Sequence, residues 1–283
     1  MTSTRKIRLA AILILLQVHP FMGAATLKPE TKAAWDEYLQ AAFAAMQARL
    51  QPGAHFLWMD DESDRAEDFR RDLRTKGPYI APMSRDIPKK VPHGLIHDWL
   101  GVGFVPNARI EDILMVVRDY DHYKDMYRPG VLDSVSRGTD GTKDLFFMRL
   151  ANRSVIAKTA LDAECEVSYI RVDDQHWYGT SNTTRIVELD KFGTPEQRTL
   201  PEDMGAGMIW RLSSITRLEE RDGGVYAELE ASALSRDIHA AFRLFVTPIV
   251  RRVSRDSLAT SLHQTKVAVD ANKAHRAEQS PVQ

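Results

Sequence analysis

Strict alternation of apolar and polar residues in two separate segments constrains the fold more than any other feature of the sequence. From Leu161 to Tyr169 the odd positions read Leu, Ala, Cys, Val and Tyr, and the even positions read Asp, Glu, Glu and Ser. From Val225 to Ala233 the odd positions read Val, Ala, Leu, Ala and Ala, and the even positions read Tyr, Glu, Glu and Ser. Because successive side chains of a strand point to opposite sides, both segments predict strands with one apolar and one polar face.

Further strands and two short helices are predicted around these segments. Residues 94–105 read as a strand that Pro106 ends, and Asn107 can cap a helix that runs to about Arg118. A second short helix covers about 120–126, and Asp-Gly pairs at 140–141 and 222–223 indicate hairpins. We expect a loop over 190–205 and the remaining strands at 131–137, 145–150, 176–188 and 208–218.

The two ends of the chain are predicted to be helical. Apolar residues recur at three- and four-residue spacing over 30–50, and Pro52-Gly53 ends this pattern. Residues 51–92 are mixed, with a short extended stretch at 56–59, a short helix near 62–74 and then a linker. Pro248 is predicted as a first-turn residue of a long helix that ends near 268, and 269–283 are predicted to be a disordered tail.

The order of these elements favours an α+β domain in which one long helix covers a curved antiparallel sheet. A sheet with one polar face must bury the other face, and only one long helix remains to cover it. Small residues on the presumed inner side leave space and favour an internal cavity; they are Ala163, Cys165, Ala227, Ala231 and Ala233. The alternative is that these small residues let the helix pack tightly against the sheet.

Two segments resemble the START-like (SRPBCC) superfamily, which has the helix-grip fold and includes lipid-transfer domains and polyketide cyclases. Residues 117–131 (VRDYDHYKDMYRPGV) resemble the family's short helices, which end at an aromatic residue and a proline before the second strand. Residues 224–253 (GVYAELEASALSRDIHAAFRLFVTPIVRRV) resemble its last strand and long helix. The resemblance covers about 93–268 and implies a deep hydrophobic cavity between sheet and helix, with 26–92 as an N-terminal helical extension outside it.

Strand alternation predicts which residues line such a cavity. The candidate ligand-binding residues are Trp210, Tyr169, Arg185, Leu212, Val167, Leu229, Thr183 and Arg149. By alternation Arg185 and Thr183 share the side of Ser181, and a buried arginine needs an anionic or carbonyl partner. Arg185 could therefore meet the head group of an amphipathic ligand, or form a structural ion pair with an acid such as Glu188 or Asp119.

The sequence carries no recognisable catalytic, cofactor or metal motif. No serine lies in a Gly-x-Ser-x-Gly turn, and Gly101-x-Gly103 lacks the third glycine of a dinucleotide site. His93 and His97 would share a strand face, but only His122 is a plausible third ligand for a metal. The single cysteine, Cys165, alternates with acids on a strand and is expected to be buried and inert. We therefore expect neither a metal nor a cofactor and assign no catalytic residue.

The first 25 residues have the pattern of a secretory signal peptide. Arg5, Lys6 and Arg8 precede the apolar run 9–16, and small residues at 23–25 suit a signal peptidase. Without this segment the chain has 35 basic and 39 acidic residues, a formal net charge of −4, which does not suit a nucleic-acid partner. No later stretch is apolar enough to span a membrane. The predicted location is therefore periplasmic or secreted.

Three functions are compatible with these patterns. The leading hypothesis is an exported carrier that holds a lipid or another hydrophobic small molecule in its cavity and makes at most transient contact with a membrane. The second is an enzyme of cyclase, aromatase or hydrolase type that uses the same cavity. In the third, residues 26–92 recruit a protein partner and the cavity is filled.

Overall fold

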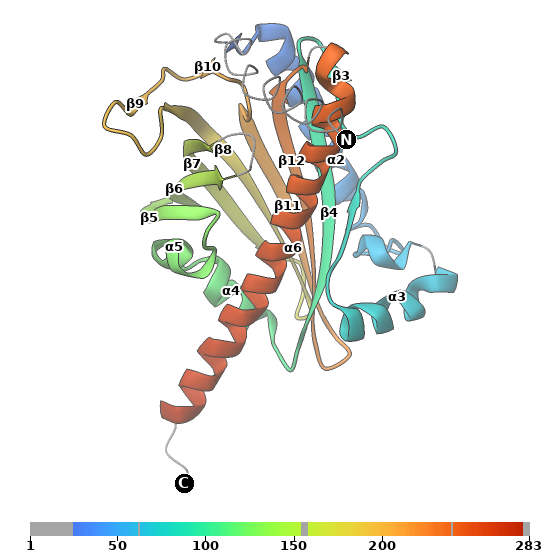
Figure 1. Ribbon diagram of the computed structural model, residues 1–283. Coiled ribbons are helices and arrows are strands. Elements are labelled where there is room, and N and C mark those ends of the chain that lie inside the picture. The colour runs from blue at the N-terminus through green and yellow to red at the C-terminus, as the bar shows by residue number, and fades with distance from the viewer. Residues whose placement is uncertain (1–24, 62, 154–157, 239, 280–283) are drawn as a thin grey trace, which may run out of the picture.

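The computed structural model describes residues 25–61, 63–153, 158–238 and 240–279. The predicted signal peptide lies almost entirely outside these residues. Within them, one antiparallel sheet dominates the fold, with the strand order β2-β4-β12-β11-β8-β7-β6-β5 (Figure 1). These strands are β2 (Tyr79–Pro82), β4 (Gly94–Pro106), β12 (Gly224–Arg236), β11 (Arg211–Arg221), β8 (His176–Asp190), β7 (Lys158–Arg171), β6 (Lys143–Arg153) and β5 (Val131–Asp140).

Short strands and helices complete the described fold. β3 (Lys89–Val91) pairs with β4, β9 (Arg198–Thr199) pairs with β8, and β1 (Ala25–Thr26) pairs with β10 (Met204–Gly205). The helices before the sheet are α2 (Pro29–Ala48), the 3-10 helix η2 (Trp58–Asp60) and α3 (Ser63–Lys76). Those that follow β4 are α4 (Ile110–Val117), η3 (Tyr120–His122), α5 (Tyr123–Met126) and, at the C-terminal end, α6 (Ala240–Gln279).

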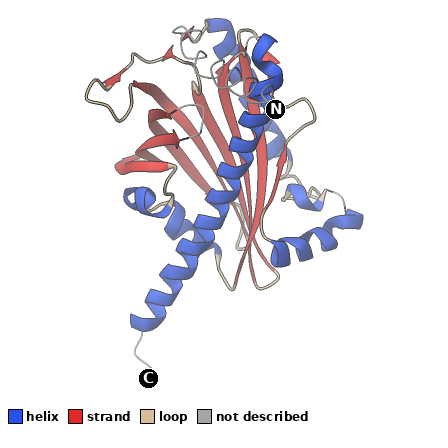
Figure 2. Cartoon of the chain, viewed as in Figure 1, coloured by secondary structure: helices blue, strands red, loops and turns tan. Residues whose placement is uncertain are grey.

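Helix α6 lies across one face of the sheet, here called the inner face (Figure 2). A Cβ atom built on Gly101 of β4 would lie 2.8 Å from Leu262 Cδ1 and 2.9 Å from Leu258 Cγ, so the helix touches the strand backbone there. α6 also contacts β2 on this side and packs on α4 and α5 at the opposite end of the face. The predicted α+β architecture is confirmed: an open curved antiparallel sheet holds one long C-terminal helix, which is the helix-grip arrangement.

The opposite face of the sheet, here called the outer face, is covered by the N-terminal elements. Leu57 and Met59 of the η2 region and Leu73 of α3 form one buried cluster with Leu100 and Tyr226. Met46 of α2 forms a second cluster with Tyr178 and Ile215. Residues 26–92 were predicted to be an extension and linker, but β2 and β3 pair with β4 and the helices bury part of the polar sheet face.

Several predicted boundaries differ from the structure. Asn107 does not cap α4; it has a left-handed φ of 55° in the turn after β4, and the N-terminal turn is instead closed by Asp112, which accepts from the Arg109 backbone N–H at 2.9 Å. Pro248 lies inside α6 and not in its first turn. A helix of this length can continue past a proline, although one backbone hydrogen bond is lost. α6 also continues past 268 to Gln279, and 58–60 form a 3-10 helix where an extended stretch was predicted.

Candidate ligand-binding face

The strand register defines the inner face row by row. One row runs from Tyr169 on β7 through Gly179, Thr216 and Leu229 to Gly101. The next rows consist of Val167, Ser181, Ser214, Ala231 and Trp99, and of Cys165, Thr183, Leu212, Ala233 and His97. The predicted alternation on β7 and β12 is confirmed, because all five small residues named from the sequence share this face.

Apolar side chains that are only half-buried gather on the inner face of the sheet. Met148, Leu150, Ile209 and Leu212 pack around a buried cluster that includes Phe146, Leu161, Ala163, Cys165, Val167 and Ile186. Leu229, beside Gly101, is also half-buried. We call Met148, Leu150, Ile209, Leu212 and Leu229 the inner apolar surface. It is the part of this face whose apolar groups remain partly accessible.

Four predicted lining residues lie on the inner face. Val167 is buried in the cluster, Leu212 and Leu229 belong to the inner apolar surface, and Thr183 bonds the Leu212 backbone N–H and carbonyl at 2.9 and 3.1 Å. Tyr169 is the fifth such residue: its hydroxyl donates to the Val117 carbonyl at 3.0 Å, and burial raises its pKa to about 12. Tyr169 is therefore a neutral hydrogen-bonded phenol at neutral pH.

Arg185 lies on the outer face, and the prediction from alternation was wrong. The pairing of β7 with β8 shifts by one residue between Glu164 and Cys165, so that Cys165 faces Thr183 while Glu164 faces Arg185. This β-bulge reverses the alternation, as an extra unpaired residue in one strand must. Arg185 is exposed, so it forms no buried head-group site. Glu188, the acid considered as its partner, instead accepts backbone N–H bonds from 206–208.

Trp210 does not lie beside Leu212 on the inner face either. It is buried in the N-terminal cluster with Trp35, Ile96 and Leu234. Ile209 and Leu212 both contact the inner cluster, so strict alternation does not hold over the residues that enter β11. Trp210 therefore lies in a cluster with Trp35 of α2, whereas the sequence predicted that it would line the cavity.

Arg149 is also an outer-face residue. It lies opposite Asp162 in the β6–β7 pairing, and its Nε and Nη2 bond the two oxygens of that carboxylate at 2.7 and 2.9 Å. This two-point ion pair satisfies the guanidinium and leaves it outside the inner face.

A polar pair on the inner face was not predicted. His97 on β4 and Ser235 on β12 are both buried, and His97 Nε2 lies 2.9 Å from Ser235 Oγ. Burial lowers the pKa of His97 to about 4, so the imidazole is neutral at pH 7. Spacing gave no signal for this pair, because the two residues are far apart in sequence and meet only through the β4–β12 register.

The α5 end of the inner face is closed by aromatic residues. Tyr120 stacks on Phe146 with ring centroids 4.4 Å apart, and Tyr123 meets both rings edge-on. The Tyr120 hydroxyl donates to Asp144 at 3.0 Å, and Arg118 binds the same carboxylate through two nitrogens. Burial, the dominant cause, raises the pKa values of Tyr120 and Tyr123 above the usual tyrosine value, so both remain neutral.

The outer face holds a buried group of charges that the sequence analysis did not identify. Arg217 of β11, 3% exposed, donates to Glu230 at 2.7 Å and to Glu228 at 3.3 Å. Glu228 also accepts the backbone N–H groups of Trp58 and Met59, each at 2.9 Å. The η2 segment is therefore attached to the sheet through a buried carboxylate.

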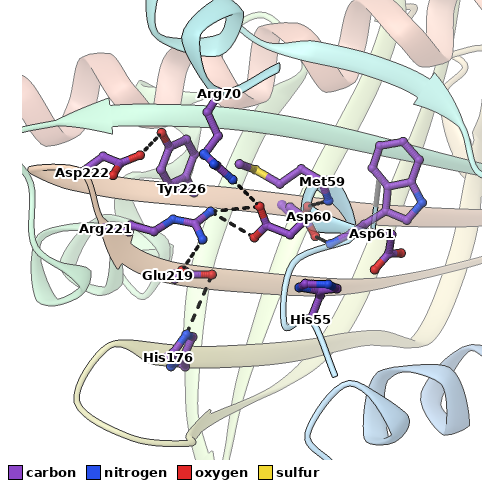
Figure 3. Close-up of polar contacts among 12 residues, drawn as sticks. His55, Met59, Asp60, Asp61, Arg70, His176, Glu219, Arg221, Asp222 and Tyr226 are labelled. Atoms are coloured by element: carbon purple, nitrogen blue, oxygen red, sulfur yellow. Dashed lines mark hydrogen bonds and ion pairs between the residues drawn. The ribbon is translucent and has the colours of Figure 1, made fainter. Parts of the chain in front are cut away.

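A second set of ion pairs continues this attachment (Figure 3). Asp60 of η2 accepts from Arg70 of α3 at 2.6 Å and from Arg221 of β11 at 3.0 Å. Arg221 lies 3.1 Å from Glu219, whose other neighbour is His176 at 3.8 Å. Charged positions on β11 that alternate with apolar ones, together with an apolar helix face at 30–50, were the available signal for this interface.

Asp98 is a buried carboxylate of the outer face that contacts α2. It accepts from the Tyr38 hydroxyl of α2 at 2.6 Å, while its Oδ1 has no hydrogen-bond partner among the described residues. Burial raises its pKa to about 6, and the nearby Glu230 charge adds to this effect.

The described residues hold neither a metal-binding cluster nor a membrane-spanning helix. Their His, Cys, Asp and Glu side chains include no group of three or more that could hold a metal ion. Their helices include none that is both long and apolar enough to cross a bilayer. Cys165 is buried as predicted, and burial raises the pKa of its thiol to about 12.

The sequence matches no protein-family model and no curated protein, but the fold is similar to solved structures. One is a STAR-related lipid transfer protein from Xanthomonas axonopodis, with 14% identity and a TM-score of 0.44, covering 69% of this chain and 99% of that chain. Human STARD10 has 11% identity and a TM-score of 0.43, covering 83% and 94%. The Zhui aromatase/cyclase from a Streptomyces species has 10% identity and a TM-score of 0.37, covering 60% and 94%. This likeness concerns the fold and not the ligand.

Proposed function

We propose that the protein is an exported carrier that holds a lipid or another hydrophobic small molecule on its inner face. The observation that carries the proposal is the inner apolar surface, where side chains such as Leu212 and Leu229 remain half-buried within a well-packed fold. Covering such surface contributes about 25 cal/mol per Å² of apolar area removed from water. An apolar ligand between these strands and α6 would gain this free energy.

Export is supported by the sequence of the first 25 residues. The basic start, the apolar run and the small residues at 23–25 together have the order of a signal peptide. We expect protein recovered from outside the cytoplasm of its native host to have the mass of a chain that begins near residue 26. A full-length mass, or retention in the cytoplasm, would contradict this part of the proposal.

The carrier function is tested by what the protein retains when purified. We expect native mass spectrometry of protein from its own host to show a bound lipid that organic solvent extracts. Leu212→Asp and Leu229→Asp should each weaken binding of a fluorescent long-chain fatty acid by about tenfold or more, because a carboxylate on this surface opposes apolar contact. The matched control is Thr184→Asp, at an exposed position outside the inner apolar surface. A protein that carries no lipid, and binds no fatty acid, sterol or phospholipid, is not a carrier.

One observation favours the enzyme of hydrolase type as a second candidate. His97 and Ser235 meet on the inner face at 2.9 Å, and a neutral histidine beside a serine hydroxyl is the pair that acyl transfer uses. In this candidate Ser235 Oγ attacks an ester carbonyl while His97 accepts the hydroxyl proton and passes it to the leaving alcohol, and water then hydrolyses the acyl-serine ester to release the acid. The test compares hydrolysis of nitrophenyl esters by the protein and by Ser235→Ala. Equal rates, or no turnover by either, reject the candidate.

A further inference from the structure

A cavity lies on the outer face, separate from the inner apolar surface. It has a volume of 320 Å³ and lies between α2 and the outer side of β7 and β8. α2 contributes Phe43, Met46 and Gln47; β6 contributes Lys143; β7 contributes Glu166, Ser168 and Ile170; and β8 contributes Tyr178, Thr180 and Asn182. This volume is within the range of about 300–1,000 Å³ in which small-molecule sites occur.

The strand wall of this cavity changes from apolar to charged along the strands. Three directly paired rungs form the wall: Ile170 with Tyr178, Ser168 with Thr180, and Glu166 with Asn182. Because side chains on one strand face repeat every second residue, neighbouring rungs are about 7 Å apart. The wall therefore spans about 14 Å, the scale of one small molecule with two chemically different ends.

The charged end of the cavity holds an ion pair with unused hydrogen-bonding capacity. Lys143 Nζ lies 2.8 Å from Glu166 Oε2, and the two side chains are 46% and 27% exposed. An ammonium has three donors and a carboxylate has two oxygens, so each group can bind a second partner. Asn182 Oδ1 accepts from Ser213, which orients the side-chain amide group. An accessible ion pair contributes about 0–1 kcal/mol to stability, so a ligand can share it at little cost.

The other end is apolar and is made by the helix as well as the sheet. Phe43, Met46 and Ile170 belong to the same hydrophobic cluster, and Met46 is almost fully buried. The Tyr178 hydroxyl accepts from Gln47 Nε2 at 3.2 Å, which links α2 to β8 at this end. Hydrophobic contacts and this bond therefore hold the two walls together.

We propose that this cavity binds a small zwitterion with an apolar substituent, of the kind that an apolar α-amino acid provides. The ligand ammonium bonds Glu166, and its carboxylate bonds Lys143. The apolar substituent extends past Ser168 and Thr180 toward Phe43 and Ile170. The two cavity charges are opposite and adjacent, so they match a ligand whose ammonium and carboxylate are attached to the same carbon atom better than an ion of one sign.

The ligand test separates the two charges of the zwitterion. Calorimetric titration of the full-length protein with phenylalanine should show saturable binding at one site. 2-Phenylethylamine, which lacks the carboxylate, and 3-phenylpropanoate, which lacks the ammonium, should each bind at least about tenfold more weakly. Glycine, which lacks the apolar substituent, should also bind at least about tenfold more weakly. Absence of phenylalanine binding, or equal binding of a single-charge analogue, overturns the proposal.

The variant test locates the binding in this cavity. Lys143→Gln and Glu166→Gln keep side-chain size, and each should raise the phenylalanine Kd by about tenfold or more. Arg149→Gln is the matched control, because it removes one member of another ion pair between the same two strands, outside the cavity lining. The thermal midpoints of all three variants show whether folding is retained. If Lys143→Gln binds phenylalanine as the control does, the site is elsewhere and the proposal is wrong.

Discussion

The same strands form both faces of the sheet, but the two faces differ in which side chains they bury. On the outer face, Arg217, Glu228 and Glu230 are buried and bonded to one another beneath the N-terminal helices. On the inner face, Leu212 and Leu229 are apolar but only half-buried. The outer face thus buries charged groups, whereas the inner face leaves apolar groups partly exposed. This is the reverse of the usual arrangement, in which apolar residues are buried and charged residues are exposed.

We expect the degree of burial, and not the polarity of a face, to separate residues that contribute to stability from residues that contribute to the proposed binding. Buried charges are tolerated only when each is paired, so the outer face can exist only with η2 and α2 in place. Half-buried apolar groups impose no such condition and remain free to contact a ligand. We therefore expect substitutions on the outer face to change folding and substitutions on the inner face to change binding.

The largest expected effect comes from removing the central charge of the outer face. Arg217→Met keeps most of the side-chain volume but leaves Glu228 and Glu230 without their guanidinium partner. Removing one member of a buried ion pair costs about 3–5 kcal/mol, measured here as the loss in free energy of unfolding by urea. Arg149→Met, which breaks a partly exposed pair, should cost below about 1 kcal/mol. Similar losses for both variants would show that the buried ion pairs of Arg217 contribute no more to stability than the partly exposed pair of Arg149.

Two residues of the β11 segment test the comparison directly. Trp210→Ala removes a side chain that is 4% exposed in the outer cluster with Trp35, and should cost about 3–5 kcal/mol in stability with fatty-acid affinity unchanged. Leu212→Ala removes a half-buried inner side chain and should cost less than about 2 kcal/mol while weakening fatty-acid binding. Urea unfolding and fluorescence titration of the same samples provide both readings. A loss of affinity in Trp210→Ala without a loss of stability would place that residue in the binding site after all.

The pH dependence of stability tests the buried carboxylate of Asp98. Its folded pKa is raised to about 6 from 3.8, so the folded state binds the proton more tightly and is favoured at low pH. This contribution is complete below pH 3.8 and is lost as pH rises through about 6, an effect of up to about 3 kcal/mol. The free energy of unfolding of Asp98→Asn, relative to the unmodified protein, should therefore rise between pH 4 and pH 7.

The variant of Asp98 carries its own control. His97 and the other titrating groups are common to both proteins, so their contributions cancel in the difference. The measurement is urea unfolding in matched buffers at several pH values. A difference that does not change with pH would mean that Asp98 titrates normally and is not sealed beneath Tyr38.

The smallest expected effect concerns the contact of α6 with the sheet. Gly101→Ala would place a methyl group 2.8 Å from Leu262 and 2.9 Å from Leu258, and such overpacking should cost about 1–3 kcal/mol. Gly103→Ala is the matched control, because its Cβ would lie 3.8 Å from Leu262 in ordinary contact. Thermal unfolding of the two variants compares one inner contact with the other. Equal midpoints would show that α6 does not pack closely at Gly101.

Local patterns were sufficient to predict the sheet and its inner face. Alternation placed Val167, Leu229 and the small residues correctly, because β7 and β12 are regular where these residues lie. Hairpin signals at 140–141 and 222–223 gave the β5–β6 and β11–β12 connections. The apolar pattern predicted the long C-terminal helix, the resemblance to the START-like superfamily agreed with it, and the structure confirms this arrangement.

The remainder depended on contacts between residues distant in sequence. Nothing near Glu228 indicates that it accepts the backbone N–H groups of Trp58 and Met59. β2 and β3 also pair with β4, although their residues were predicted to belong to a linker. Arg185 and Trp210 were misplaced because alternation was extended through a bulge and through an irregular strand entry.

The bulge in β8 has a consequence for how substitutions spread through this strand. One extra residue, at 184, changes the phase of the strand, so that odd positions face inward before it and even positions face inward after it. Deleting that residue would remove the bulge and keep Ile186 inward and Arg185 outward in one regular phase, whereas losing the bulge with residue 184 still present would exchange the faces of everything on one side. The extra residue thus decides which face each half of the strand presents, and an insertion in β8, or a deletion at another position, would matter more than a change of side chain.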